Sequence, residues 1–147
     1  LFKEFVRNFF RIEQNRFGVG SEIINWQALP LGDASLDLLP AMRTDISLTS
    51  ASRKIIIDTK YYSQAFQVYY EKESIHSANL YQLHAYLTNL DYGECGSAQC
   101  EGVLLYPTVE KEIDMTYDIK GHKVRIHTIN LNQEWQDIHR DLLALLE

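Results

Sequence analysis

Cysteine is scarce in this chain of 147 residues, which contains only Cys95 and Cys100. A disulfide framework, a four-cysteine zinc site and an iron–sulfur cluster each need more cysteines than this. An isolated pair favours reduced thiols in a cytoplasmic protein. A mixed zinc site that includes a histidine stays open, although the spacing of the five histidines does not support it.

Long apolar runs and a signal-peptide pattern are also missing, so the sequence predicts no membrane-spanning segment and no membrane partner. The chain begins with Leu1 rather than methionine, already within a helical pattern, and we therefore expect a piece of a longer protein. Its length and its hydrophobic content of 46% predict a single domain over residues 1–147.

Positive charge is in short supply, because 14 Lys and Arg residues stand against 20 Asp and Glu residues and the net charge is −6. A protein that holds DNA by itself usually presents a basic face. A local basic patch is compatible with this composition, but the overall field would not attract a polyanion. Any function on nucleic acid therefore needs help from another domain or partner.

Hydrophobic periodicity predicts the order helix, three strands, helix, three strands, helix. The helices are expected over residues 1–14, 76–90 and 132–147, single strands over 22–29 and 103–107, and hairpins over 43–62 and 113–131. Residues 30–40 and 63–74 are interpreted as connections. This order favours one α/β sheet with helices packed against it.

The hairpin over 43–62 is the most informative segment, because charged residues follow an apolar run directly. Residues 55–57 are three isoleucines, which is typical of a strand that is buried on both faces. Side chains alternate along a strand, so Asp58 and Lys60 share one face at its end. Burying these charges costs free energy unless they are paired or bind a metal.

The hairpin adds a second carboxylate if its turn lies between Ala51 and Ser52. In that register Asp45 lies opposite Asp58, with their β-carbons ~4.5–5.5 Å apart. Two carboxylates at this separation repel each other, and Mg²⁺ or Mn²⁺ with its waters relieves the repulsion. Lys60 can then orient a water or stabilise charge on a phosphate. An ordinary salt bridge between an aspartate and Lys60 is the competing interpretation.

Gln82 and Tyr86 lie one turn apart on the same face of the helix predicted over 76–90. This helix follows the hairpin in the chain and can pack over the end of the strand that carries Asp58. Gln82 would then reach a metal-bound water or the DNA backbone. The alternatives are a polar helix edge at Gln82 and a core position for Tyr86.

These motifs together resemble a known nuclease superfamily. Asp45, then "DTK" at 58–60, then Gln82-x-x-x-Tyr86 resemble the PD-(D/E)xK nucleases, with a helix motif similar to that of the RecB-like branch. A closer resemblance is to the McrC-like nuclease subunits of McrBC modification-dependent restriction systems. It runs through "LLPAMRTDI", "KIIIDTKYY", "HSANLYQLHAYL", "GVLLYP" and "INLNQEWQDIHRDLL", and so covers most of the chain.

The resemblance implies a restriction-endonuclease-like α/β fold with a central mixed sheet flanked by helices, and places this chain in the C-terminal nuclease domain. The implied site comprises the catalytic metal ligands Asp45 and Asp58, the carbonyl of Thr59 as a further ligand, the catalytic Lys60 and Gln82, and Tyr86 for DNA contact or structural support. The implied cofactor is Mg²⁺, for which Mn²⁺ can substitute.

The implied partners are a GTP-hydrolysing AAA+ protein like McrB and double-stranded DNA with modified cytosine, in the cytoplasm. GTP would be used by that partner and not by this chain. A RecB-like exonuclease or repair nuclease would share the same residues. A non-catalytic assembly module on the same fold is a further alternative.

The sequence departs from the superfamily pattern at one motif and leaves a second question open. The leading Pro-Asp pair of the superfamily is Thr44-Asp45 here, which does not affect the metal-ligand argument. Some members also use a glutamate of the first helix, for which Glu4 and Glu13 are the candidates.

Overall fold

The computed structural model describes residues 1–61, 66–69, 72–75, 77–90, 95, 100–108 and 112–147. Its helices are α1 (Phe2–Glu13), α2 (Ser77–Asn89) and α3 (Trp135–Leu143), with 3-10 helices η1 (Leu36–Leu38) and η3 (Ala144–Leu146). The strands are β1 (Gly18–Gly20), β2 (Ile23–Ile24), β3 (Met42–Arg43), β4 (Ile46–Thr49), β5 (Lys54–Thr59), β6 (Phe66–Tyr69), β7 (Lys72–Ile75), β8 (Glu101–Thr108), β9 (Asp114–Ile119) and β10 (His122–Asn130). None of these helices has both the length and the apolar composition needed to cross a membrane.

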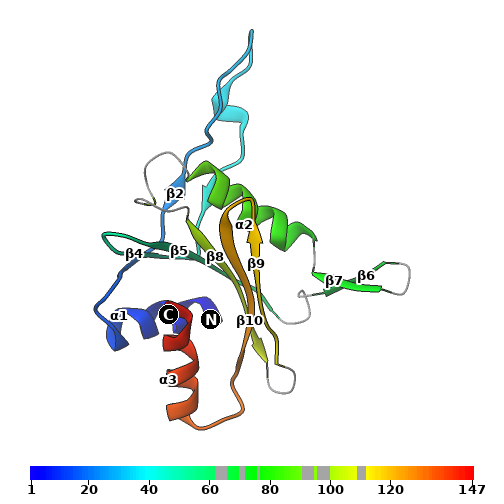
Figure 1. Cartoon of the computed structure of the whole chain (residues 1–147). Coiled ribbons are helices and arrows are strands. Elements are labelled where there is room, and N and C mark those ends of the chain that lie inside the picture. Colours follow the sequence, from blue (N-terminus) through cyan, green and yellow to red (C-terminus); the bar gives the residue numbers. More distant parts are fainter. Residues whose placement is uncertain (62–65, 70–71, 76, 91–94, 96–99, 109–111) are drawn as a thin grey trace.

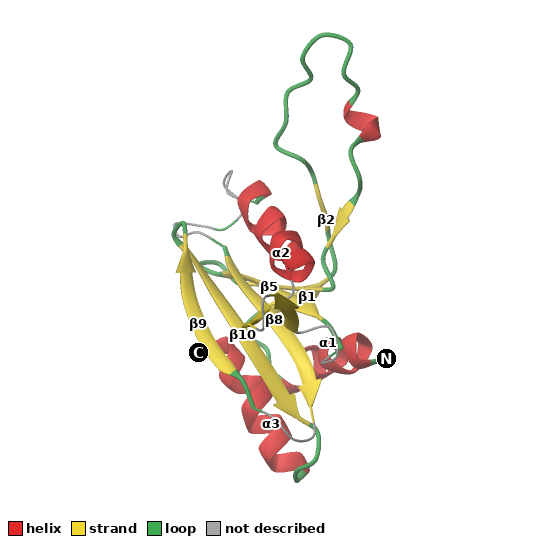
Figure 2. Cartoon of the chain, turned by 90° about the vertical axis from the view of Figure 1, so that its right-hand side faces the viewer, coloured by secondary structure: helices red, strands yellow, loops and turns green. Residues whose placement is uncertain are grey.

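Six strands form the central sheet in the order β1-β4-β5-β8-β10-β9. The pairs β5–β8 and β8–β10 are parallel, whereas β1–β4, β4–β5 and β9–β10 are antiparallel, so the sheet is mixed. α2 covers one face, and α1 and α3 cover the other (Figure 1 and Figure 2). The predicted α/β sheet with helices packed against it is therefore confirmed.

The triple isoleucine of β5 explains why the sheet needs a helical layer on each side. Ile55 and Ile57 belong to the core that α1 and α3 cover, while Ile56 belongs to the core that α2 covers. All three are at most 1% exposed, as predicted for a strand with two covered faces. Leu104 and Leu105 of β8 divide between the two cores in the same way, so β5 and β8 form the buried middle of the sheet.

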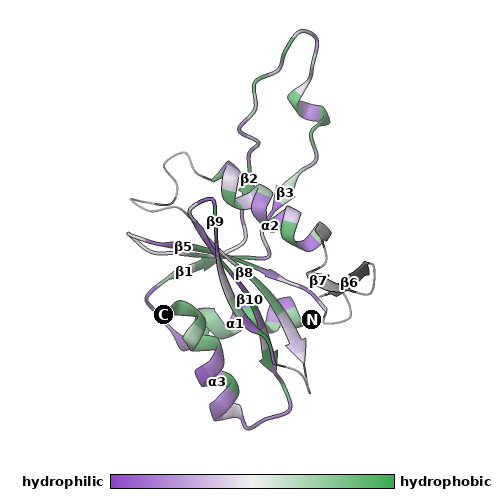
Figure 3. Ribbon diagram, turned by 45° about the vertical axis from the view of Figure 1, so that its right-hand side comes forward, coloured by the Kyte–Doolittle hydropathy of each residue, from purple (hydrophilic) through white to green (hydrophobic). Residues whose placement is uncertain are grey.

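An arm of residues 25–41 extends away from the sheet between β2 and β3 (Figure 2). At its base the indole N–H of Trp26 donates to the carbonyl oxygen of Pro40 at 2.7 Å. Hydrophobic and hydrophilic segments alternate along it (Figure 3), and Leu29 is 87% exposed. The strand predicted over 22–29 is therefore too long, because only β2 pairs, with β3 in a separate two-stranded sheet, and residues 25–29 belong to no strand.

Several strands differ from the sequence-based prediction. β1 was not predicted, because its three residues include two glycines, and it forms by antiparallel pairing with β4. The connection predicted over 63–74 contains the antiparallel pair β6–β7 in its described parts. β8 continues one residue beyond Pro107, where the sequence suggested that the strand ends. In each case pairing with a neighbouring strand outweighs a weak local signal.

The structure joins Cys95 and Cys100 in a disulfide, so the prediction of reduced thiols is wrong for this structure. Their Cα atoms are 5.1 Å apart, within the range that a disulfide spans. Both side chains are buried in the core that α2 covers. From the sequence alone only the spacing of the two cysteines is known, and their proximity in space comes from the folded structure.

Candidate functional site

The hairpin of β4 and β5 has the register on which the sequence argument depended. Ile46 pairs with Ile57, and residues 51–52 form the turn. One step beyond that pair, Asp45 precedes β4 and Asp58 lies near the end of β5. The antiparallel register therefore brings the two aspartates together, as predicted.

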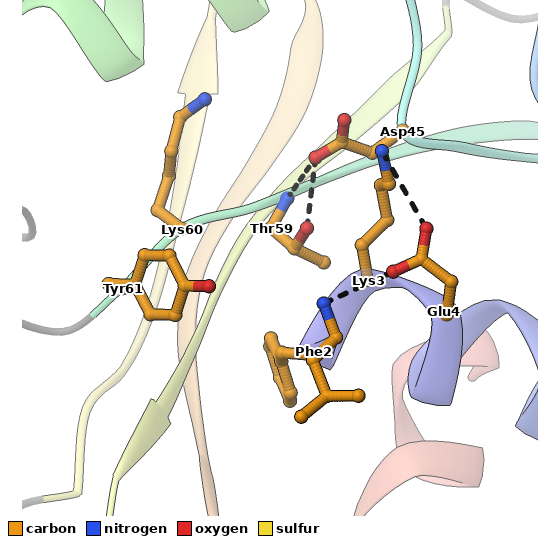
Figure 4. A pocket seen from close by; sticks show the side chains of 8 residues that line it. Phe2, Lys3, Glu4, Asp45, Thr59, Lys60 and Tyr61 are labelled. Atoms are coloured by element: carbon orange, nitrogen blue, oxygen red, sulfur yellow. Dashed lines mark hydrogen bonds and ion pairs between the residues drawn. The ribbon is translucent and has the colours of Figure 1, made fainter.

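Thr59 holds the carboxylate of Asp45 at the end of β5. Oδ2 of Asp45 accepts hydrogen bonds from the backbone N–H and from the hydroxyl of Thr59, both at 2.9 Å (Figure 4). Asp45 itself is only partly buried. Two donors on one oxygen fix the direction of the carboxylate and place its charge beside Asp58.

The carboxylate of Asp58 is buried, since only 2% of this residue is exposed. Its Oδ2 lies 3.0 Å from Nζ of Lys60, an ion-pair distance. This buried oxygen nevertheless accepts no hydrogen bond within the described structure. Burial raises the pKa of Asp58 to about 6, the ammonium group of Lys60 opposes that rise, and the carboxylate of Asp45 adds to it.

Lys60 is also bound to α2 through the predicted helix motif. Its ammonium group donates to Oε1 of Gln82 at 3.0 Å, and Nε2 of Gln82 donates to the hydroxyl of Tyr86 at 2.7 Å. Tyr86 is 5% exposed and belongs to the core that α2 covers. The structure thus connects Lys60, Gln82 and Tyr86 in one chain of hydrogen bonds that ends in the core.

A pocket of about 390 Å³ opens beside Asp45 and the end of β5. Figure 4 shows that the start of α1 forms its opposite wall. The pocket is lined by Leu1, Phe2, Lys3, Glu4, Asp45, Thr59, Lys60 and Tyr61. Asp58 and Gln82 do not line it, because Asp58 is buried and Gln82 projects from α2. Asp45 and Lys60 therefore connect the pocket to the buried carboxylate.

The fold separates the two glutamates of α1 that the sequence left as candidates. Glu4 lines the pocket, with its carboxylate 3.9 Å from Nζ of Lys3. Glu13 lies at the other end of α1, 3.2 Å from Nε2 of His139. No local sequence signal distinguishes them, because only the packing of α1 decides which of its ends meets the end of β5.

The two aspartates fit a divalent cation. Mg²⁺ prefers oxygen ligands, keeps several waters, and is commonly held through one or two carboxylates. A buried Asp58 oxygen that accepts no hydrogen bond, next to the like charge of Asp45, is an arrangement that a cation completes. Within the described ranges no group of three or more His, Cys, Asp or Glu side chains gathers to bind a metal, so the zinc alternative has no support there.

Comparison with known proteins places the chain in a family. A family profile described as "McrBC 5-methylcytosine restriction system component" matches residues 1–107. The chain belongs to the McrBC family. The match includes every site residue predicted from the sequence, from Asp45 to Tyr86. The predicted resemblance to McrC-like subunits of these systems is thereby confirmed.

A relative from Escherichia coli (strain K12), the "Type IV methyl-directed restriction enzyme EcoKMcrBC", is 37% identical to the chain over 149 residues. The similarity covers 100% of this chain and 42% of the relative. The chain thus spans less than half the length of this McrBC relative.

Proposed function

We propose that this chain is the Mg²⁺-dependent DNA endonuclease domain of a modification-dependent restriction system, built on the PD-(D/E)xK fold. The observation that carries the proposal is the pair Asp45 and Asp58 at the end of β5, with Lys60 at 3.0 Å from the buried carboxylate. Membership in the McrBC family supports DNA with modified cytosine as the substrate. The reaction would take place in the cytoplasm.

A GTP-hydrolysing AAA+ partner like McrB would bring the DNA to this subunit. The net charge of −6 supports this arrangement, because the overall field of the chain does not attract a polyanion. Recognition of the modified base would then lie in the partner, and this chain would contribute the phosphodiester hydrolysis.

Each residue of the site has a distinct role in the proposed reaction. Asp45, Asp58 and the carbonyl of Thr59 would hold Mg²⁺, which when bound polarises a phosphate and lowers the pKa of a water. Lys60 places a positive charge where negative charge develops on the phosphate. Gln82 accepts a hydrogen bond from Lys60, so it positions the lysine rather than the attacking water.

Mn²⁺ binding tests the metal site without the partner. Titration calorimetry of the wild-type chain should show saturable binding of Mn²⁺, and Asp58→Ala should abolish it because the buried ligand is lost. Asp33→Ala is the matched control, since Asp33 is an exposed aspartate of the arm, and this variant should bind like the wild type. Equal binding by the Asp58 variant, or none by a folded wild type, would contradict the metal site.

DNA cleavage in the presence of the partner tests the function itself. With Mg²⁺ and GTP, the assembled proteins should cut duplex DNA that contains modified cytosine and leave unmodified DNA intact. Cleavage that needs a free DNA end and no GTP would indicate the RecB-like exonuclease instead. Metal binding without any cleavage would favour the assembly module.

Gln82→Ala is expected to lower the rate of cleavage by roughly 10- to 100-fold, because Lys60 loses the acceptor that fixes its ammonium group. Lys60→Ala should lower it by about 10²- to 10³-fold. The double variant should be no slower than Lys60→Ala alone, since Gln82 acts through Lys60. Single-turnover rates measure all three, with Gln136→Ala on the exposed face of α3 as the control. Additive losses would argue against the positioning role.

A further inference from the structure

The first helix carries positive charges that lead away from the pocket. Lys3, Arg7 and Arg11 are four residues apart, which places them along one side of α1. Lys3 lines the pocket together with Asp45 and Lys60, and Figure 4 shows its side chain extending toward Asp45. A rise of about 1.5 Å per residue separates Lys3 from Arg11 by about 12 Å. We call these three residues the α1 stripe.

Two charges of the α1 stripe are not neutralised by the described part of the protein. Lys3 lies 3.9 Å from a carboxylate oxygen of Glu4, near the limit of an ion pair. Arg7 and Arg11, by contrast, form no ion pair with any described carboxylate. Three basic residues elsewhere are paired at 2.7–2.8 Å, namely Arg53 with Glu101, Lys54 with Glu22 and Arg140 with Asp137, whereas exposed cations such as Lys120 and Lys123 form no ion pair with a described carboxylate. The α1 stripe thus continues from Lys3 at the pocket to two unpaired arginines farther along α1.

Arg7 is partly buried while its charge stays unpaired. Nε of Arg7 is buried and takes part in no hydrogen bond with the described residues. Val6 and Phe10 on the same helix are 0% exposed, so Arg7 lies where the core meets solvent. An ordered side chain loses less conformational entropy when it binds a ligand. Arg7 is therefore suited to bind an anion at a fixed position on α1.

Arg11 permits a second, purely structural interpretation. It is exposed and lies in the last turn of α1, where a cation interacts favourably with the helix dipole. That interaction contributes to the stability of α1 but not to the binding of an anion. Measurements of binding and of stability therefore separate the two roles.

We infer that Lys3, Arg7 and Arg11 bind the phosphate backbone of a DNA strand that runs from the candidate metal site along α1. This inference rests on the proposed function, because it takes DNA as the substrate. One strand of a duplex carries a phosphate every ~3.4 Å along the axis, so about 12 Å spans three or four phosphates. Phosphate contacts carry no sequence information, so the α1 stripe would hold modified and unmodified DNA alike.

The salt dependence of DNA binding tests this inference. In EDTA, fluorescence anisotropy with a labelled unmodified duplex gives the affinity of the chain at several salt concentrations. Replacing both arginines, Arg7→Gln with Arg11→Gln, should reduce the slope of log K against log salt by about 1.8, since each phosphate contact contributes about 0.9. Arg11→Gln alone, an exposed substitution, should reduce it by about 0.9 and serves if the double variant does not fold.

The matched control removes two positive charges elsewhere. Lys120 and Lys123 are exposed residues at the β9–β10 turn, beyond the end of the sheet where β5 and β8 begin. Lys120→Gln with Lys123→Gln should leave the slope unchanged. A slope that falls equally in both double variants, or a wild type that does not bind the duplex at low salt, would overturn the inference.

Metal binding distinguishes failure of this inference from failure of the proposed function. The Arg7 and Arg11 variants should bind Mn²⁺ as the wild type does, because neither arginine is a proposed ligand. Normal Mn²⁺ binding with an unchanged salt slope would overturn the α1 stripe alone. A wild type that shows the expected slopes but binds no Mn²⁺ would overturn the metal-dependent nuclease and retain the stripe as a DNA-binding surface.

Discussion

Asp58→Asn is expected to abolish DNA cleavage and, at the same time, to make the metal-free protein more stable at pH 8. Loss of the proposed metal ligand would remove several kcal/mol of transition-state stabilisation, which corresponds to a rate lower by about 10³-fold or more. Cleavage by the assembled proteins in Mg²⁺ and GTP measures this loss. Asp33→Asn, on the exposed arm, should cleave at the wild-type rate.

The gain in stability follows from the direction of the pKa shift. Folding raises the pKa of Asp58 from 3.8 to about 6, so the folded state binds the proton more tightly than the unfolded state. The neutral carboxyl of Asp58 contributes fully to the free energy of unfolding below pH 4, and this contribution is lost as the pH rises through about 6. A pKa shift of this size corresponds to about 3 kcal/mol of destabilisation by the buried carboxylate at high pH. In Asp58→Asn the ammonium group of Lys60 loses its counter-charge, which offsets part of the gain in stability.

Denaturant unfolding in EDTA measures this effect. Asp58→Asn should increase the free energy of unfolding by roughly 1–2 kcal/mol at pH 8, and the difference should shrink toward pH 4. Added Mg²⁺ should stabilise the wild type and not the variant. A variant that is less stable than the wild type at pH 8 would show that the ion pair with Lys60 outweighs the cost of burial.

Leu104→Ala is expected to lower the free energy of unfolding by about 2–5 kcal/mol. Leu104 is 0% exposed, belongs to the core that α2 covers, and pairs in register with Asp58 across β5 and β8. The substitution would leave a cavity beside β8. The neighbouring strands β5 and β10 are held by the sheet and cannot move to fill it. Because small proteins are stable by only about 5–15 kcal/mol, the variant should unfold at a much lower urea concentration.

Leu29→Ala is the matched control for this measurement. Leu29 is 87% exposed on the arm, so the same substitution should change stability by less than about 0.5 kcal/mol. Similar urea midpoints for the two variants would contradict the burial of β8 beneath α2. The contrast also tests whether the arm contributes to the stability of the sheet.

The order of the main elements was predictable because local periodicity encodes it. The isoleucines of residues 55–57 identified a strand with two covered faces, and β5 is such a strand. The predicted helix around Gln82 and Tyr86 corresponds to α2. β1 could not be predicted, because "GVG" has no apolar alternation and becomes a strand only through its pairing with β4.

The sequence by itself determined that Asp58 and Lys60 share one face at the end of a buried strand, since alternation along a strand is a local property. It also placed Gln82 and Tyr86 on one face of a helix, for the same kind of reason. The tertiary structure alone decided that Lys60 binds Gln82 and that Glu4 rather than Glu13 lines the pocket. These relations join segments far apart in the chain, and no local pattern specifies how a helix packs against the end of a strand.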